Sequence, residues 1–188
     1  VLLVNAFAAA GHKVSLITFR PGGPLISTLA KNVAHHALQK YDTHLDWFAP
    51  GLTTLIEKFT PDIILCMGRI ANCYAHTFVN EAQDRWPKTA VICTMRTGKR
   101  LPWLYRHSLR KARHVVANSR AAGKILIDSH GLSPERLTVI TNSLLFPPDQ
   151  VITRNKSLRA EHGADSRTNV LLDVAMLRKE KNQRELIA

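Results

Sequence analysis

The segment 115–142, VVANSRAAGKILIDSHGLSPERLTVITN, constrains the fold of this chain more tightly than any other stretch. It begins with a short apolar run at 115–117 and ends with a second one at 137–140. Between them, apolar residues recur at spacings of three and four over about 120–129, which is the period of an amphipathic helix. A strand, a crossover helix and a second strand form a βαβ unit, and such units build parallel sheets covered on both faces.

Local signals fix the limits of the predicted helix. Asn118 or Ser119 supplies a side-chain oxygen that can cap its first N–H groups, and Gly131 can adopt the left-handed conformation that ends a helix. The residues expected on its inner face are Ala122, Ile125, Leu126 and Ser129.

The same alternation of apolar runs and amphipathic stretches precedes this unit. We expect strands at 14–19, 63–67 and 90–95. We expect helices at 1–10, 52–59, 71–86 and 102–112, and a weakly helical or mixed region at 25–40. This alternation predicts a doubly wound α/β domain that binds ligands at the C-terminal ends of its strands. Neither GxGxxG nor GxxxxGK[ST] follows any predicted strand, which disfavours an ordinary dinucleotide-binding or P-loop protein.

After residue 143 the sequence becomes rich in proline and then polar. We predict three parts: a Rossmann-like domain over 1–143, a linker and connecting helix over 144–167, and the first βα unit of a second domain over 168–188. Within the last part, NVLLDVAML at 169–177 is the predicted strand.

Composition indicates an anionic partner. The chain carries 26 Lys and Arg against 14 Asp and Glu, a formal charge of +12. This charge fits nucleic acid, a phosphorylated small molecule or an anionic membrane surface. Three cysteines without a CxxC pair are expected to be buried thiols in a reducing cytoplasm, and they indicate no metal site. No apolar run approaches the length needed to span a bilayer.

Much of the positive charge is concentrated between Asp84 and Asp128, where the sequence has no acidic residue. We expect contacts to a membrane or another polyanion from Lys99, Arg100, Trp103, Arg106, Arg110 and Lys111. Tyr105 is a second aromatic residue in this stretch. Basic side chains with interfacial aromatics suit an anionic headgroup layer. The alternative is a non-catalytic basic α/β protein that binds RNA or another polyanion, and a solvated basic face without a partner is the third interpretation.

Several segments, taken in order, resemble the retaining two-domain glycosyltransferases of the GT-B fold, family 4. They are GHKVSLITF, PDIILCM, the 115–142 segment, RAEHG, VLLDVAML and KNQRELIA. The resemblance implies an acceptor-side first domain and a second domain that binds a nucleotide-sugar donor. It implies sugar transfer to a glycan or lipid-linked acceptor in cell-envelope polysaccharide or lipopolysaccharide synthesis, in the cytoplasm or on the inner face of its membrane. No cofactor, no metal and no specific nucleic acid is expected. Further family segments are expected before Val1 and after Ala188.

The donor diphosphate site implied by the resemblance falls near the start of the second domain. Family members place an Arg and a Lys there, and Lys181 matches the Lys. Met176 stands where the Arg is usual, so Arg178 is the candidate replacement from the same loop. The alternative is a solvated basic loop.

The acceptor cleft implied by the resemblance lies at the strand ends of the first domain. Many members end the strand that matches VICTM with a His, where this chain has Arg96. An Arg stays protonated and cannot act as a general base, but it can hold a phosphate with two hydrogen bonds. Arg69 and Asn72 are further cleft candidates, with capping or packing of the following helix as the alternative. Asn142 matches an Asn of the family and is expected in a turn.

Overall fold

The chain folds into two compact units, 1–143 and 144–188. The computed structural model describes residues 1–81, 85–96, 101–142, 153, 155–175, 177 and 182–187. The predicted sites at Lys99, Arg100, Arg178 and Lys181 lie outside these residues.

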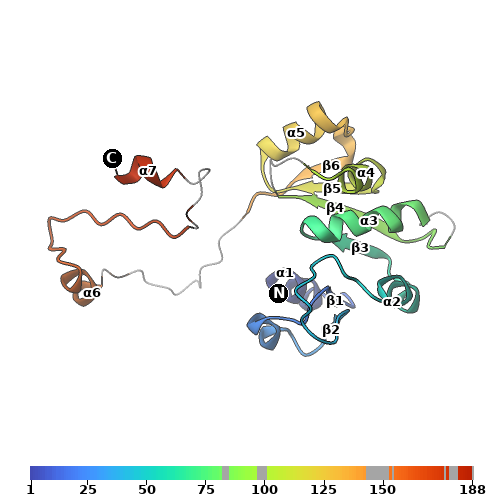
Figure 1. The fold of residues 1–188 in the computed structure, drawn as a ribbon, viewed down its shortest axis with the longest axis horizontal. Coiled ribbons are helices and arrows are strands. Elements are labelled where there is room, and N and C mark those ends of the chain that lie inside the picture. The colour runs from blue at the N-terminus through green and yellow to red at the C-terminus, as the bar shows by residue number, and fades with distance from the viewer. Residues whose placement is uncertain are drawn as a thin grey trace. The chain divides into compact units, whose positions relative to one another are not determined.

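A parallel sheet forms the centre of the first unit (Figure 1). Its strands are β3 (Ile63–Cys66), β4 (Ala90–Met95), β5 (His114–Ala117) and β6 (Leu137–Val139), and they are neighbours in that order. Every pairing is parallel, with Cys66 opposite Cys93 and Cys93 opposite Val115. The strands predicted at 63–67, 90–95, 115–117 and 137–140 are confirmed.

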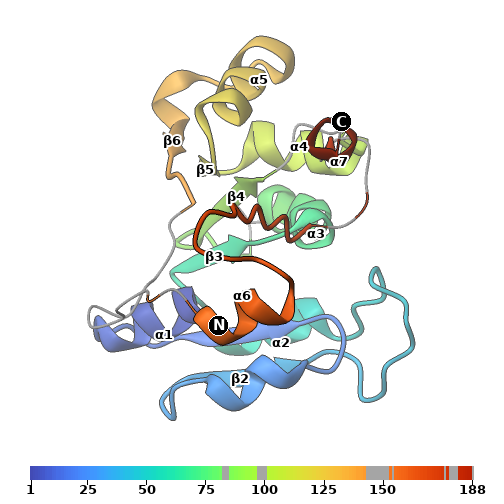
Figure 2. The same cartoon turned by 90° about the vertical axis from the view of Figure 1, so that its left-hand side faces the viewer.

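A separate parallel pair lies beyond β3, as two perpendicular views show (Figures 1 and 2). It consists of β1 (Ser15–Thr18) and β2 (Ala34–Ala37). The 25–40 region was predicted as weakly helical or mixed, and its strand was missed. It begins with a 3-10 turn at Pro24–Thr28, and β2 then places His35 against Thr18 (3.0 Å) and the His36 ring against Phe59. The strand β2 thus depends on contacts with residues distant in sequence, because its own residues alternate little in polarity.

Among the described residues, five α-helices accompany these strands. They are α1 (Leu2–Ala9), α2 (Leu52–Phe59), α3 (Arg69–Glu81), α4 (Trp103–Lys111) and α5 (Arg120–His130). Each matches a predicted helix, and the predicted end of α3 at residue 86 is the one point of difference. Trp86 lies outside the helix and packs its buried ring against Phe78 at 5.9 Å.

The caps of α5 are those expected from the sequence. The Ala122 N–H donates to Ser119 Oγ over 3.1 Å, and Gly131 ends the helix with φ of 64°. Its inner face holds Ala122, Gly123 and Leu126, whereas Ser129 is exposed and does not belong to that face.

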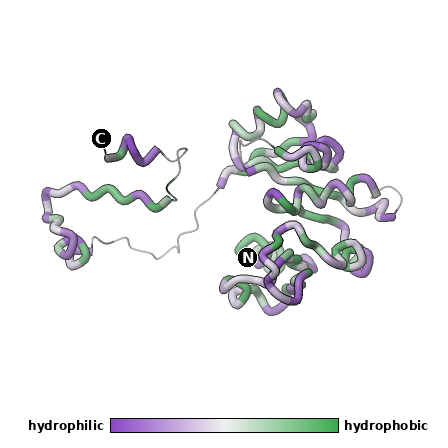
Figure 3. The backbone as a smooth tube through the Cα atoms, viewed as in Figure 1, coloured by the Kyte–Doolittle hydropathy of each residue, from purple (hydrophilic) through white to green (hydrophobic). Residues whose placement is uncertain are grey.

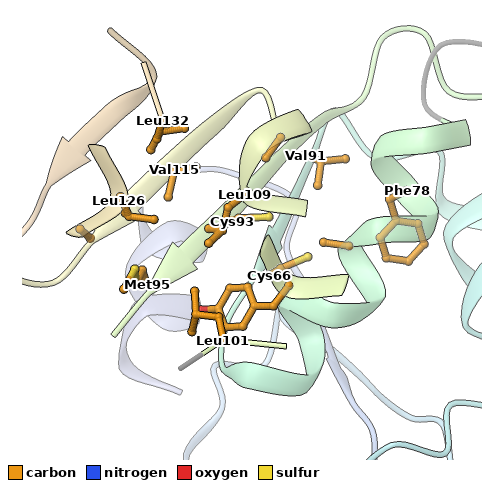
Figure 4. Close-up of a cluster of buried hydrophobic side chains, with 14 of the residues drawn as sticks. Cys66, Phe78, Val91, Cys93, Met95, Leu101, Leu109, Val115, Leu126 and Leu132 are labelled. Atoms are coloured by element: carbon orange, nitrogen blue, oxygen red, sulfur yellow. The ribbon is translucent and has the colours of Figure 1, made fainter. Parts of the chain in front are cut away.

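The core of the first unit lies where the strands meet α3, α4 and α5 (Figure 4). Cys93, Leu109, Val115 and Leu126 converge there, each almost inaccessible to solvent. Cys66 and Cys93 are buried free thiols, as predicted, while Cys73 is half-buried. Burial raises the pKa of the Cys66 thiol to about 12, so it stays protonated at neutral pH.

The described residues of the second unit form two short helices, α6 (Lys156–Glu161) and α7 (Gln183–Ile187). The strand predicted at 169–177 is wrong for the described residues of that segment, none of which is in a strand. Val170, Leu171 and Leu172 form an apolar run (Figure 3), and all three are exposed. A strand requires a neighbour to accept and donate its backbone hydrogen bonds, and the described residues of this unit offer none.

Candidate functional site

A cavity of about 260 Å³ lies where β1 and β3 end. Its lining comes from the residues that follow the two strands, with one residue of a third loop: Phe19, Arg20, Asp46, Met67, Gly68, Arg69, Ile70 and Ala71. This is the carboxyl edge of the parallel strands, where ligands were predicted to bind. The fold therefore brings together the ends of two strands that are distant along the chain, and both line one site.

Arg20 connects this cavity to a larger neighbouring one of about 730 Å³. Its guanidinium donates to both carboxylate oxygens of Asp42 over 2.7 Å and to Asp46 Oδ1 over 2.9 Å. This bidentate geometry is the strongest form of a charged hydrogen bond. It fixes the loop that carries Asp42 and Asp46 against the end of β1. Arg20 was missed as a candidate, although its place directly after a strand is a signal that the sequence contains.

The ion pair with Arg20 changes the pKa of the Asp42 carboxyl. The Arg20 guanidinium and the His44 backbone N–H lower the pKa of the Asp42 carboxyl from 3.8 to about 2. Because the folded state has the lower pKa, this pair stabilises the fold above about pH 4, and the contribution is lost as pH falls toward 2.

We expect Arg20→Gln to return the Asp42 pKa toward its ordinary value in a carboxyl NMR titration. Lys13→Gln, which removes an exposed cation elsewhere, should leave the titration unchanged; an equal response to both variants would contradict the assignment.

Arg69 is the first residue of α3 and lies exposed on the wall of the smaller cavity. The chain enters the helix through Gly68, whose φ of 87° suits a residue without a side chain. The N–H groups at a helix start lack partners within the helix and form the positive end of its dipole. The wall formed by 68–71 thus offers a guanidinium and a helix start together, an arrangement suited to an anionic group.

Arg96 follows β4 and is exposed. The β3–β4 register pairs Cys66 with Cys93, and Arg69 and Arg96 each lie three residues beyond that pair. The two cations therefore leave the same edge of the sheet from neighbouring strands. Arg96 is not among the residues that line the two cavities.

Asn72 is fully buried and lines neither cavity. Its Oδ1 accepts from the Thr94 N–H over 2.9 Å, and its Nδ2 donates to Gly68 O over 2.6 Å. Thr94 Oγ1 in turn donates to Cys66 O over 2.9 Å, and the Tyr105 hydroxyl donates to Thr94 O. This buried network joins the ends of β3 and β4 to α3 and α4. Asn72 therefore holds the edge of the site rather than facing a ligand.

The basic stretch divides into exposed and buried parts. Trp103, Arg106, Arg110 and Lys111 are exposed on α4. Tyr105 is buried, so the expectation that it accompanies Trp103 at a surface is wrong. An aromatic ring two positions from Trp103 points to another side of a helix and enters the core. Two other cations of the stretch are paired with acids, Arg85 with Glu57 and Lys124 with Asp128.

No group of three or more His, Cys, Asp or Glu in the described part of the chain could hold a metal ion. No helix among the same residues is long and apolar enough to cross a bilayer.

Comparison with known proteins gives a family and a fold. A glycosyltransferase from Rickettsia africae ESF-5 of known crystal structure is similar, with a TM-score of 0.59 and 15% sequence identity. The match covers 88% of this chain and 45% of that protein, so the chain spans less than half the length of this relative. At this identity the likeness shows the fold alone, and it confirms the predicted α/β class. No protein of curated function matches the chain.

The sequence model of one family matches residues 1–144, which include every element that encloses the two cavities. Because this match spans most of the 188 residues, the chain belongs to Glycosyltransferase Family 4.

Proposed function

We propose that the protein transfers a sugar from a nucleotide-activated donor to a glycan or lipid-linked acceptor, with retention of configuration at the anomeric carbon. The observation that carries the proposal is the cavity at the carboxyl edge, lined by Arg20 and Arg69, in a chain whose residues 1–144 match the family. The acceptor would bind at this edge, and synthesis of cell-envelope polysaccharide or lipopolysaccharide is the proposed setting.

The residues at the edge suit binding rather than proton abstraction. Arg69 and Arg96 carry guanidinium groups, which donate hydrogen bonds and cannot act as a base. They can position a hydroxylated acceptor or hold its phosphate, which places the reacting hydroxyl and raises the rate through orientation. Lys181 and Arg178 are the proposed ligands of the donor diphosphate, where an ammonium and a guanidinium would balance its negative charge. The chemistry itself would then depend on stabilising the departing nucleotide diphosphate.

The direct test is an assay of the full-length protein with a panel of nucleotide sugars. Release of free nucleotide in the presence of membrane glycolipid or glycan acceptors is the expected result. The anomeric configuration of the product, read by NMR, tests retention. Absence of both transfer and donor hydrolysis across UDP-, GDP- and ADP-sugars would contradict the proposal.

The two candidate subsites should respond separately to substitution. We expect Arg69→Gln to raise the KM for acceptor about tenfold and to leave the donor Kd unchanged, since one charged hydrogen bond contributes roughly 1.5 kcal/mol. Lys181→Ala should instead weaken donor binding about tenfold, because it removes a charge facing the diphosphate. Calorimetric titration of the donor and steady-state kinetics of the acceptor distinguish the two effects. Lys156→Ala, at an exposed lysine of α6, is the control. An unchanged donor Kd in Lys181→Ala would contradict the diphosphate assignment.

A further inference from the structure

One face of α4 carries a stripe of cations with a single exposed aromatic ring. We call the set Trp103, Arg106, Arg110 and Lys111 the α4 stripe. Trp103, Arg106 and Arg110 are spaced by three and four and share one side of the helix, and Lys111 lies next to Arg110, about 100° round the helix axis. The opposite side enters the core through Tyr105, Ser108 and Leu109. Burial of that side fixes the direction of the stripe toward solvent.

No carboxylate among the described residues neutralises the stripe. Its polar contacts with the described residues are to neutral groups: Arg110 Nε donates to His130 O over 3.3 Å, and Lys111 Nζ donates to Asn80 Oδ1 over 3.2 Å. The ion pairs formed by Arg85 and Lys124 show that other cations of the basic stretch do find acids. The α4 stripe is thus an uncompensated positive surface in the described part of the chain.

Neighbouring histidines respond to this positive field. The pKa of His107 is lowered by burial and by the charges of His76, Lys111 and Arg110. The pKa of His130, at the end of α5, is lowered by burial and by Arg106 and Arg110. Both histidines are therefore favoured in the neutral form while the surface is free, and an anion placed on it would reduce the repulsion.

The exposed ring is held in a defined position. The Trp103 ring meets the His76 ring edge to face at 5.5 Å, and the His107 ring lies 4.6 Å from that of His76. Asn80 joins the two histidines, with contacts of 3.1 Å to His76 Nε2 and 3.0 Å to His107 Nε2. Trp103 nevertheless leaves 62% of its surface exposed. These ring contacts hold Trp103 at the surface beside the cations of the α4 stripe.

We propose that the α4 stripe docks the protein on an anionic bilayer surface, with Trp103 in the interfacial layer and the three cations on lipid headgroups. Trp favours the headgroup level because it combines an apolar ring with an N–H donor. Nine residues of α4 span about 13 Å, so the stripe can lie along the bilayer plane. Single-stranded RNA, by contrast, is bound over successive stacked aromatic rings, and α4 exposes one ring only.

Docking would place the candidate site close to the lipid. Helix α4 follows β4 and Arg96, so its first residues lie toward the same edge of the sheet as the smaller cavity. A lipid-linked acceptor could then reach this edge while its chains stay in the bilayer. Docking itself does not depend on sugar transfer, so its test uses binding alone.

The experiment is flotation of the full-length protein with vesicles of phosphatidylcholine alone or with about a third phosphatidylglycerol. We expect recovery with the anionic vesicles only, and weaker recovery at about 0.5 M than at about 0.1 M NaCl because salt screens the charges. The variant Arg106→Gln/Arg110→Gln/Lys111→Gln should bind about a hundredfold more weakly, since each cation near the surface contributes about fivefold. Its control, Lys13→Gln/Lys31→Gln/Lys58→Gln, removes three exposed cations from other elements and should bind normally.

Trp103→Ala has an unusually close control. Trp47 also exposes 62% of its surface, but it belongs to the loop after β2. We expect Trp103→Ala to weaken vesicle binding at least fivefold and Trp47→Ala to leave it unchanged. Circular dichroism of each variant confirms folding. Equal recovery on neutral and anionic vesicles, equal losses in the paired variants, or RNA that competes fully with the vesicles at the same salt would each overturn the proposal.

Discussion

Leu126→Ala should lower the free energy of unfolding by about 3 to 4 kcal/mol. Leu126 lies on the inner face of α5 with no exposed surface, among Cys93, Leu109 and Val115 (Figure 4). Truncation removes its burial and leaves a cavity, because neighbours held by a parallel sheet can close only part of the space. Urea denaturation followed by circular dichroism measures the loss.

Ile127→Ala is the matched control, one residue further along the same helix. Ile127 is 36% exposed, so its truncation should cost less than that of Leu126, about 1 to 2 kcal/mol. The two variants have the same helix propensity at the new residue, and the difference between them therefore reports burial. Similar losses in both would mean that α5 does not pack as described. A large loss in Leu126→Ala alone would establish α5 as part of the core.

The α5 unit shows which features could be predicted from the sequence. Its helix period, the Ser119 cap and the Gly131 terminator act over a few residues, so the sequence contains nearly all the information. Strand β2 is the contrasting case. His35 and His36 carry no apolar alternation, and the strand exists because β1 supplies its hydrogen bonds. Such a pairing joins residues about twenty positions apart, which no local pattern encodes.

The candidate site was predictable as a place but not as a list of residues. Strand ends located Arg69 and Arg96 at the carboxyl edge, since parallel strands share one edge. The role of Arg20 depends on Asp42 and Asp46, acids in a loop with no expected structure. The directions of the side chains on α3 also separate two of the predicted cleft residues. Arg69 faces the cavity, whereas Asn72 points inward.

Asn72→Ala is expected to cost about 3 kcal/mol of unfolding free energy, through a mechanism unlike that of Leu126. It would leave the buried Thr94 N–H without its acceptor and remove a donor from Gly68 O. Asn72→Asp keeps an acceptor for Thr94 but places a carboxylate beside the Gly68 carbonyl, so it should be at least as harmful. Asn32→Ala, at an exposed amide with one long contact of 3.5 Å, should be nearly neutral.

The same variants separate a structural role of Asn72 from a role in the acceptor cleft. Asn72 lies behind the cavity wall, and its two partners belong to the turn before α3 and to β4. If it holds that wall, then Asn72→Ala should lower the thermal midpoint, and kcat should fall with the loss of folded protein. If instead it touched the acceptor, the KM for acceptor would rise while the midpoint stayed the same. Only the first outcome agrees with a side chain that is fully buried and hydrogen-bonded on both of its polar atoms, because an acceptor could reach it only after α3 had separated from the sheet.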